Sequence, residues 1–249
     1  TFNQENVIMG PTMRMTQVLS VDDLSLHMRR IVLTGDSLSD FPENKESAHV
    51  KVIFPDVNSA DKKPKLGLYL GFKKWMRSYT IRSFDKQNLA LAIDFAVRDH
   101  EGLASNWALQ AKVGDYLGIA GPGDIKHTNL LADKHLLFGD ITALPAIAAT
   151  LEKLPNNAVG HAYIQVPDQQ DIQQLVMPKN VKVHWLVTEN KLTEEFLSRL
   201  ASQGDNLAGT AIFIAAEASV IKQLKAHLNA RCRYDKAMLY ASAYWNKKR

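Results

Sequence analysis

The chain has 249 residues, of which 46% are hydrophobic and 22% charged, and these values exclude intrinsic disorder and allow one large or two smaller folded domains. No stretch reaches the ~18 consecutive apolar residues of a membrane span, and residues 1–20 lack the apolar core of a secretory signal, so we expect a cytoplasmic protein. Residues 231–249 hold six basic residues and one acid within a net charge of +4, which favours an anionic partner near the C-terminus, although a solvated tail fits equally well.

The first half of the chain predicts an all-β barrel or sandwich, because short β-rich runs alternate with polar, Gly or Pro breaks. In residues 89–97 the apolar side chains fall on alternate positions, so one face enters a core while Asp94 points the other way. In residues 49–55 the same alternation places His49 and Lys51 on the polar side. The expected strands are residues 29–35, 49–55, 66–72, 79–84, 89–97 and 115–121.

A single helix interrupts the strands over residues 101–115, where Ser105 can cap the helix and Gly114 can end it. The Gly/Pro turn and polar chain of residues 120–133 then favour a domain boundary. We therefore expect two domains, residues 1–128 and residues 129–249.

The second half predicts alternating strands and helices, which is typical of a parallel sheet covered on both faces. In a doubly wound sheet of this kind ligands bind outside the carboxyl ends of the strands. The loops at residues 139–145 and 215–219 occupy such positions, but neither is a G-x-G-x-x-G fingerprint, and each can also be a plain connection. The expected strands are residues 135–139, 158–166, 181–188, 210–215 and 236–245, and the expected helices or turns are residues 142–155, 168–176, 193–202 and 217–230.

The segment RSYTIR, residues 77–82, is the most informative short stretch. On a strand, Arg77 and Tyr79 share one face, while Ser78 and Thr80 share the other. A guanidinium beside an aromatic ring suits a ligand with a phosphate at one end and a flat heterocycle at the other. A strand with exposed arginines and a half-buried tyrosine is the alternative interpretation.

RSYTIR resembles the R-x-Y-T flavin-binding motif of the ferredoxin-reductase superfamily. The chain more narrowly resembles the siderophore-interacting proteins, which are FAD-dependent ferric-siderophore reductases. The matching segments, in order, are MRRIVLTG, HVKVIFP, RSYTIR, IDFAVRDHEGLASNWALQAKVGDYLGIAGPG, LLFGDITALPAIAATLEKLP and LYASAYW. The resemblance spans nearly the whole chain and implies an antiparallel Greek-key FAD-binding β-barrel followed by a doubly wound NAD(P)H-binding-like α/β domain.

The resemblance also implies which residues bind FAD. Tyr79 would stack on the isoalloxazine, Arg77 would pair with the phosphates, and Thr80, the one catalytic candidate, would contact the polar edge of the ring. Asp99 and His100 stand where the family commonly has His-Gly, so His100 can equally be a surface histidine. The full expected set is Arg77, Ser78, Tyr79, Thr80, Asp94, Val97, Arg98, His100, Ala104 and Ser105.

The segment GDITALP resembles the family's G-D-E-T-A-L-P, with Ile141 in place of the usual acid. Ala216 stands where the family has glycine, and its methyl is expected to crowd a nicotinamide. Glu217 can be a ligand or only the acid at the start of a helix. The expected NAD(P)H residues are Gly139, Asp140, Thr142, Ala143 and Glu217.

The implied activity is the reduction of a ferric siderophore with electrons from NAD(P)H or a ferredoxin. Oxygen donors hold Fe(III) much more tightly than Fe(II), so reduction releases the metal. Trp245 is expected to anchor the last segment against the barrel or to lie in the core. The single cysteine, Cys232, has no partner for an internal disulfide and no metal-ligand spacing, so we predict no protein-bound metal. We also predict a monomer with no membrane or nucleic-acid partner. A general flavin or ferredoxin reductase and a non-catalytic siderophore-binding module remain alternatives. The expected basic pocket for the anionic substrate consists of Lys51, Arg233, Lys236, Lys247 and Lys248.

Overall fold

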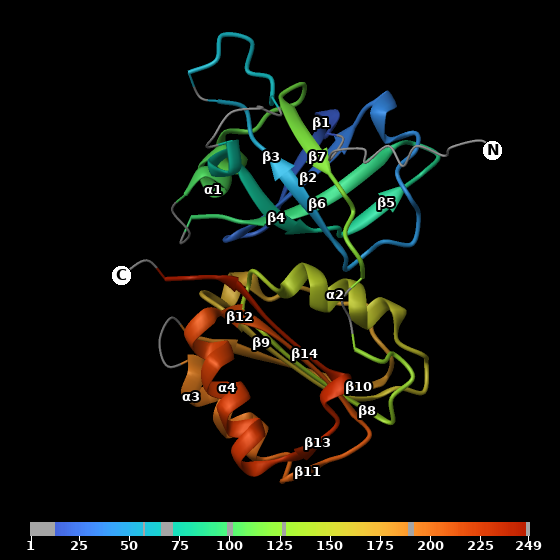
Figure 1. The fold of residues 1–249 in the computed structure, drawn as a ribbon, viewed down its shortest axis with the longest axis vertical. Helices are drawn as coiled ribbons and strands as arrows, with labels where there is room; N and C mark the ends of the chain where they lie inside the picture. The colour runs from blue at the N-terminus through green and yellow to red at the C-terminus, as the bar shows by residue number, and fades with distance from the viewer. Residues whose placement is uncertain are drawn as a thin grey trace, which may run out of the picture.

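The computed structural model describes residues 13–56, 58–65, 72–98, 102–125, 128–188 and 192–247. Two domains are stacked along the long axis of the molecule, an antiparallel β-domain and a parallel α/β domain (Figure 1). This arrangement confirms the predicted fold class. None of the helices in these ranges is long and apolar enough to cross a bilayer.

The first domain is a seven-stranded antiparallel sheet with the order β4-β3-β7-β1-β2-β6-β5. The sheet curls into a barrel, because Tyr79 on β4 meets Phe95 on β6 with ring centroids 4.3 Å apart. The helix α1 (Leu103–Gln110) and the 3-10 turns η1 (Asp36–Leu38) and η2 (Phe72–Trp75) complete the domain. The strands are β1 (Met13–Ser25), β2 (Met28–Thr34), β3 (His49–Ile53), β4 (Met76–Thr80), β5 (Ser83–Asp85), β6 (Ala90–Ala96) and β7 (Tyr116–Ala120).

Two local predictions for this domain were incomplete or wrong, and a third is largely untested. The sequence pattern does not predict β1, although it is a 13-residue strand, because polar residues interrupt its apolar alternation. The helix α1 begins after Gly102, so Ser105 lies inside its first turn and does not cap it. The strand expected at residues 66–72 falls largely outside the described residues.

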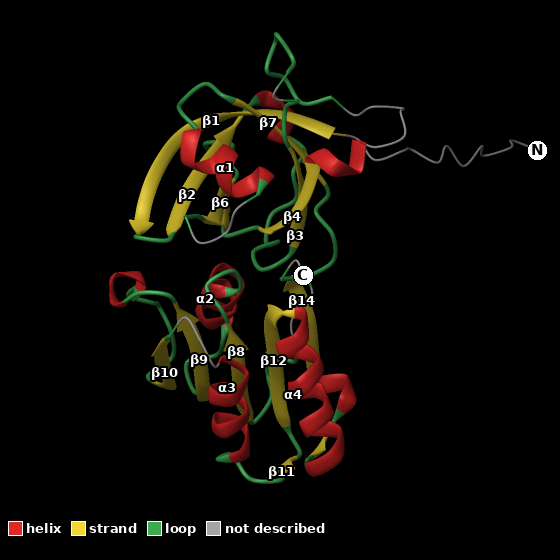
Figure 2. Ribbon diagram, turned by 90° about the vertical axis from the view of Figure 1, so that its left-hand side faces the viewer, coloured by secondary structure: helices red, strands yellow, loops and turns green. Residues whose placement is uncertain are grey.

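The second domain is a five-stranded parallel sheet with the order β10-β9-β8-β12-β14. Helix α2 (Leu144–Lys153) covers the face that turns toward the barrel, while α3 (Leu192–Ala201) and α4 (Ala218–Arg231) cover the other face (Figure 2). Residues 168–176 form only the 3-10 turn η3 (Gln169–Asp171), held by a capping box, and no longer helix. The remaining elements are β8 (Lys134–Gly139), β9 (Val159–Val166), β10 (Asn180–Val187), β11 (Asn206–Leu207), β12 (Thr210–Glu217), β13 (Arg233–Tyr234), η4 (Lys236–Met238) and β14 (Leu239–Trp245).

The two domains are joined by the segment between the end of β7 and the start of β8, residues 121–133, which contains the predicted boundary. That boundary itself stays a prediction. Ion pairs cross the interface between Arg82 and Glu152 on α2, with nitrogen–oxygen distances of 2.5 and 3.0 Å, and between Lys153 and Glu46 at 2.8 Å. These contacts hold α2 against the barrel, and the carboxyl end of β14 lies close to the end of β4, because Tyr244 lies beside Thr80.

A third interdomain contact involves Asp171, whose side chain is fully buried. Its carboxylate accepts hydrogen bonds from the Ser25 hydroxyl at 2.8 Å and from the His27 backbone amide at 2.7 Å, and it also meets the His27 ring at 2.7 Å. Met28 of the barrel is 1% exposed and packs within the apolar cluster of the α/β domain. The interface therefore combines apolar burial with a satisfied buried carboxylate.

Candidate active site

The outer face of the β3–β4 hairpin carries four polar side chains. Antiparallel pairing places His49 opposite Thr80 and Lys51 opposite Ser78, and residues two apart on a strand share a face. The Lys51 ammonium donates to the Ser78 hydroxyl at 2.5 Å. Burial and the neighbouring Tyr240 raise the pKa of the Tyr244 phenol well above its usual value, while Thr80 lowers it, so Thr80 lies beside Tyr244 near the carboxyl end of the parallel sheet. This polar face of the barrel therefore meets the α/β domain at Thr80.

The opposite face of β4 carries the predicted aromatic and guanidinium pair. Tyr79 is half-buried, packs on the barrel core and leans on Phe95 with an interplanar angle of 37°. Burial raises the pKa of the Tyr79 phenol well above its usual value, so the ring is neutral and offers a flat, uncharged surface. Arg77 is exposed, and its guanidinium donates to the carbonyls of Lys74 and Met76 at 2.9 and 2.8 Å.

These positions fit a ligand with a flat heterocycle and an anionic end. β4 is the terminal strand in the described sheet order, so its outer edge presents main-chain donors and acceptors to a ring lying beside it. Tyr79 provides the stacking surface. The Arg77 guanidinium can exchange its hydrogen bonds to two neutral carbonyls for hydrogen bonds to a charged phosphate, which are stronger. The residues present therefore fit the flavin nucleotide expected from the motif.

Two predicted cofactor residues have structural roles instead. Asp94 is 7% exposed, and both of its oxygens accept from the Arg30 guanidinium at 2.7 and 2.8 Å. Val97 is 1% exposed in the barrel core, and its amide donates to the His27 carbonyl at 3.0 Å. The Val97 side chain therefore packs in the barrel core, and the prediction that this residue flanks the cofactor stays a prediction.

Of the neighbouring predicted residues, the structure describes Arg98 but not His100. Arg98 is exposed and has a φ of 70°, in the left-handed region that a non-glycine residue rarely adopts. Such a conformation is most often retained next to a functional site. His100 lies outside the described residues, so its role stays a prediction.

The first turn of α1 contributes backbone groups to the same end of the barrel. The first helical hydrogen bond runs from the Asn106 amide to the Gly102 carbonyl at 2.9 Å, so the preceding amides have no acceptor within the helix. The side chains of Ala104 and Ser105 are 7% and 5% exposed. We therefore expect their amides, and not the Ser105 hydroxyl, to meet an anion.

The loop after β8 is built around Asp140, which is 2% exposed. One oxygen of its carboxylate accepts from the amide and the hydroxyl of Thr142 at 3.0 and 2.5 Å, and the other accepts from the indole N–H of Trp245 at 2.8 Å. Asp140 therefore ties the loop to the end of the chain. Trp245 anchors the last segment to the α/β domain and not to the barrel.

Gly139 and Ala143 are both buried and shape this loop without lining its surface. A Cβ at Gly139 would lie 2.8 Å from the Cβ of Ala143 and 2.7 Å from the Ile147 side chain, so only glycine allows α2 to approach β8 this closely. Ala143, and not Thr142, occupies the position before α2, with Pro145 in its first turn.

Glu217 caps helix α4, as the second interpretation of the sequence allowed. One oxygen accepts from the Ser219 amide at 2.6 Å and from the Ser219 hydroxyl, and the other accepts from the Lys247 amide at 3.2 Å. Ala216 is fully buried in the cluster that faces α3 and α4. Its methyl packs among residues of α3 and α4, and the expected crowding of a nicotinamide stays a prediction.

The predicted basic pocket does not form as a single site. Arg233 lies on β13 and Lys236 in η4, both just before β14 and at the end of the α/β domain that is remote from the barrel, whereas Lys247 follows the end of β14 (Figure 1). A strand of seven residues spans about 20 Å, and this length separates the two groups. Lys51 and Lys247 are the expected substrate residues that remain near the interface, and Lys248 lies outside the described residues.

Sequence reasoning missed Tyr244 and His49 as components of the site. Tyr244 belongs to the aromatic run AYW, which signals an apolar end to the last strand but does not reveal that Tyr244 lies beside Thr80. His49 was predicted on the polar side of its strand, and its ring lies against Gly123, where an added Cβ would come within 2.6 Å. Both contacts depend on tertiary pairing and leave no local signal.

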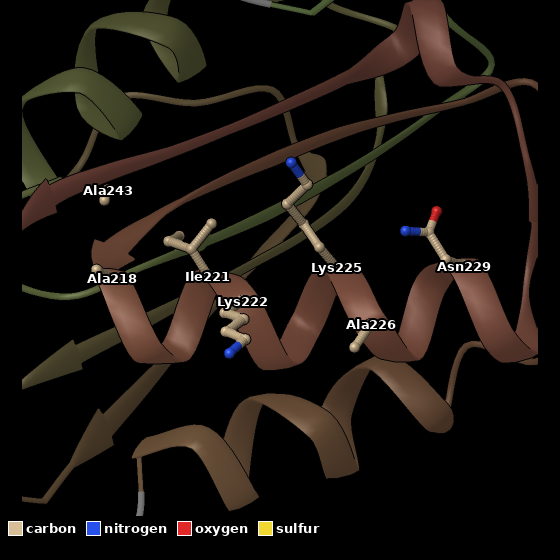
Figure 3. Close-up of a pocket in the computed structure, with 7 residues that line it drawn as sticks. All are labelled: Ala218, Ile221, Lys222, Lys225, Ala226, Asn229 and Ala243. Atoms are coloured by element: carbon tan, nitrogen blue, oxygen red, sulfur yellow. The ribbon is translucent and has the colours of Figure 1, made fainter.

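A separate pocket of about 430 Å³ lies between α4 and the edge strand β14 (Figure 3). Lys225 and Asn229 project along its strand side, while Lys222 points away from the strand. None of the predicted site residues lines it. Within the described ranges, the structure shows no group of three or more His, Cys, Asp or Glu side chains that could hold a metal ion.

Comparison with known proteins identifies both domains. A family model described as siderophore-interacting FAD-binding domain matches residues 17–125, and one described as siderophore-interacting protein matches residues 132–248.

Three related proteins match most of the chain. Ferric vibriobactin reductase of Vibrio cholerae is 32% identical over 234 residues, which cover 90% of this chain and 86% of that protein. The NADPH-dependent ferric-chelate reductase of Escherichia coli is 31% identical over 240 residues, covering 93% and 92% of the two chains. The crystal structure of a siderophore-interacting protein from Aeromonas hydrophila superposes with a TM-score of 0.82 at 31% identity, over 96% of this chain and 93% of the other.

Proposed function

The chain belongs to the siderophore-interacting protein family, and we propose that it is an FAD-dependent oxidoreductase that reduces ferric siderophores and thereby releases Fe(II). The observation that carries the proposal is the placement of RSYTIR. Its tyrosine is half-buried at the barrel surface, and its threonine faces the carboxyl end of a parallel sheet. A flavin and an electron donor can meet at that junction.

The chemistry follows from the different affinities of siderophores for the two oxidation states of iron. Hard oxygen ligands bind Fe(III) far more tightly than Fe(II), so a one-electron reduction loosens the complex. FAD, when bound, accepts a hydride as an electron pair and passes electrons on singly, which no side chain does. One NAD(P)H therefore supplies the two electrons that reduce two ferric ions. The products are NADP⁺ or NAD⁺, one proton and two Fe(II).

The chain's own residues position the reactants. Tyr79 stacks on the isoalloxazine from one face of β4, and Arg77 pairs with the phosphates, together with the free amides at the start of α1. Thr80 offers a hydroxyl to the polar edge of the ring. Lys51 lies on the same face as Thr80, where its ammonium attracts an anionic ferric siderophore.

The electron donor that we propose is NAD(P)H. The NADPH-dependent relative from Escherichia coli supports this donor, as do the loops at the carboxyl ends of β8 and β12. A ferredoxin is the alternative donor. We propose that the reaction takes place in the cytoplasm and that the protein acts as a monomer, which fractionation and sedimentation would test.

The proposed function is tested with purified protein. We expect a yellow protein with flavin absorbance that NADPH bleaches under anaerobic conditions. Adding a ferric siderophore should restore the absorbance, and a ferrous chelator should trap about two Fe(II) per flavin reoxidised. Absence of flavin after reconstitution with FAD would contradict the proposal.

Two further arms of this experiment separate the alternative functions. Tight binding of a ferric siderophore without Fe(II) under any reductant would indicate a binding module. Equal rates with unrelated electron acceptors would indicate a general flavin or ferredoxin reductase.

A further inference from the structure

The basic residues near the C-terminus gather on α4 and around the edge strand β14. Residues 217–247 hold six Lys or Arg and only two acids. Both acids are used as caps, since Glu217 accepts from the Ser219 amide and Asp235 accepts from the Ala237 amide. Within the described ranges all six basic side chains are exposed and none forms an ion pair, so their charge is available to a partner. They are Lys222, Lys225, Arg231, Arg233, Lys236 and Lys247.

β14 presents an open edge beside these charges. It pairs with β12 on one side and ends the described sheet order, so the main-chain groups on its other side have no strand to bond. Arg233 and Lys236 lie just before the strand and Lys247 lies just after it. The seven residues of β14 span about 20 Å. A small anion cannot meet both groups of cations, whereas an extended peptide of about seven residues matches the span.

The pocket between α4 and β14 adds a floor along this edge. Lys225 and Asn229 project along its strand side (Figure 3). The side-chain oxygen of Asn229 accepts from the Tyr234 hydroxyl at 2.6 Å, so the amide hydrogens remain for a carbonyl. No acid lines the pocket, and three of its lining residues are alanines, whose short side chains leave room beside the strand. Apart from Lys222, the rest of the lining is apolar and consists of Ala218, Ile221, Ala226 and Ala243.

We propose that the groove between α4 and β14 is a docking site for an extended acidic segment of a partner protein, which adds to the parallel sheet as a further strand beside β14. Main-chain hydrogen bonds to the open edge supply affinity, and pairing of acidic side chains with Lys225 supplies specificity. Side chains of the added strand alternate between the two faces of the sheet, so acids at every second position lie on the α4 side.

The same features disfavour other occupants. A nucleic acid lacks the alternating N–H and C=O groups that a strand edge pairs with, and no aromatic ring lines the pocket for a base to stack on. A second copy of this chain would bring the same cations to the edge, where like charges repel. Neither Lys222 nor Lys225 is assigned to the proposed reaction, so docking is measured independently of that reaction.

The probe is a seven-residue peptide in which glutamate alternates with valine, with fluorescein at its N-terminus. Its binding to the FAD-loaded full chain is measured by fluorescence anisotropy at low and high salt. Two further peptides carry N-methyl groups on alternate residues, one in each register, because N-methylation removes the main-chain donors from one edge of a strand and leaves the charge unchanged. A peptide with lysine in place of glutamate tests the sign of the charge.

Three charge reversals locate the site on the protein. Lys225→Glu should raise the Kd of the acidic peptide about five- to tenfold at low salt, because it replaces an attraction by a repulsion beside the edge. Lys222 points away from the strand in Figure 3, so Lys222→Glu should raise the Kd only about twofold. Lys179→Glu is the matched control, since it changes an exposed lysine next to β10 at the opposite edge of the sheet, and the Kd should stay unchanged. Thermal unfolding checks that every variant is folded.

We expect the acidic peptide to bind, the lysine peptide not to bind, and only one of the two N-methylated peptides to keep its affinity. Amide hydrogen exchange in β14 should slow when the acidic peptide is bound. Absence of binding at low salt would overturn the docking site. Equal affinities of both N-methylated peptides, or equally tight binding of a labelled seven-nucleotide oligothymidine, would show charge attraction without strand addition and would overturn it as well.

Discussion

Replacing Tyr79 by alanine removes a ring that has two distinct roles in the proposed site. Its inner side packs on Phe95, with 4.3 Å between centroids, and its remaining surface is proposed to stack on the flavin. Loss of a stacking contact with a flat heterocycle costs about 1–3 kcal/mol, which corresponds to a roughly 5- to 150-fold rise in Kd. Because the ring is half-buried, truncation should also lower the free energy of unfolding by about 2 kcal/mol.

The phenol hydroxyl is not expected to contribute to FAD binding. Burial raises the pKa of Tyr79 well above neutrality, so the group carries no charge at working pH. Tyr79→Phe should therefore bind FAD within about twofold of the unmodified protein, because the ring supplies the stacking surface. The comparison between the phenylalanine and alanine variants isolates the ring.

FAD affinity is measured by titrating the apoprotein and following flavin fluorescence, and stability is measured by urea unfolding of the same apoprotein. Phe84→Ala is the matched control, since Phe84 is another half-buried aromatic of the barrel, packed on Phe41 at 4.9 Å. It should lose similar stability but keep its FAD affinity. Equal FAD affinities for Tyr79→Ala, Phe84→Ala and unmodified protein would refute the stacking role.

Three other predictions concern the interface and the substrate. Burial opposes ionisation of Asp171, but the hydrogen bonds from His27 outweigh burial and lower the pKa of the carboxyl group. The ionised carboxylate therefore stabilises the fold fully above about pH 4, and this stabilisation is lost as the pH falls through the folded pKa. Urea unfolding of Asp171→Asn should show a weaker acid dependence than that of unmodified protein. Lys51→Gln should raise the KM for an anionic ferric siderophore by about two- to fivefold at low salt without changing the FAD content, and a KM equal to that of unmodified protein at both low and high salt would contradict this role. Arg82→Gln should reduce the free energy of unfolding by about 1–3 kcal/mol, and a double-mutant cycle with Glu152→Gln that gives no coupling energy would show that the ion pair contributes nothing.

Local periodicity predicted the helices and strands that bury one regular set of apolar side chains. β6 follows the alternation of residues 89–97, and α2 follows the helical spacing of residues 142–155, because each buries one regular set of apolar positions. β1 is absent from the prediction, since its acidic and polar residues pair with the basic face of β2, as Asp23 does with Arg29 at 2.6 Å. A strand stabilised by such cross-strand pairs has no strong apolar pattern of its own.

The sequence predicts candidate site residues that are adjacent along the chain, but not residues that meet only in the fold. Tyr79 and Thr80 are neighbours, so one motif identified both. Arg233 and Lys247 are near each other in sequence, but an extended strand carries them to opposite ends of the domain. The partner of Asp94 on β2 depends on strand register, which a single sequence does not reveal.

The domain interface limits the kind of motion that could open the site. Separating the domains would expose Met28, break the Arg82–Glu152 pair and leave the buried carboxylate of Asp171 without its donors from the barrel. Each of these losses costs about 1–3 kcal/mol, so together they strongly oppose separation. The barrel and the parallel sheet are therefore expected to keep their relative orientation when a ligand binds at their junction.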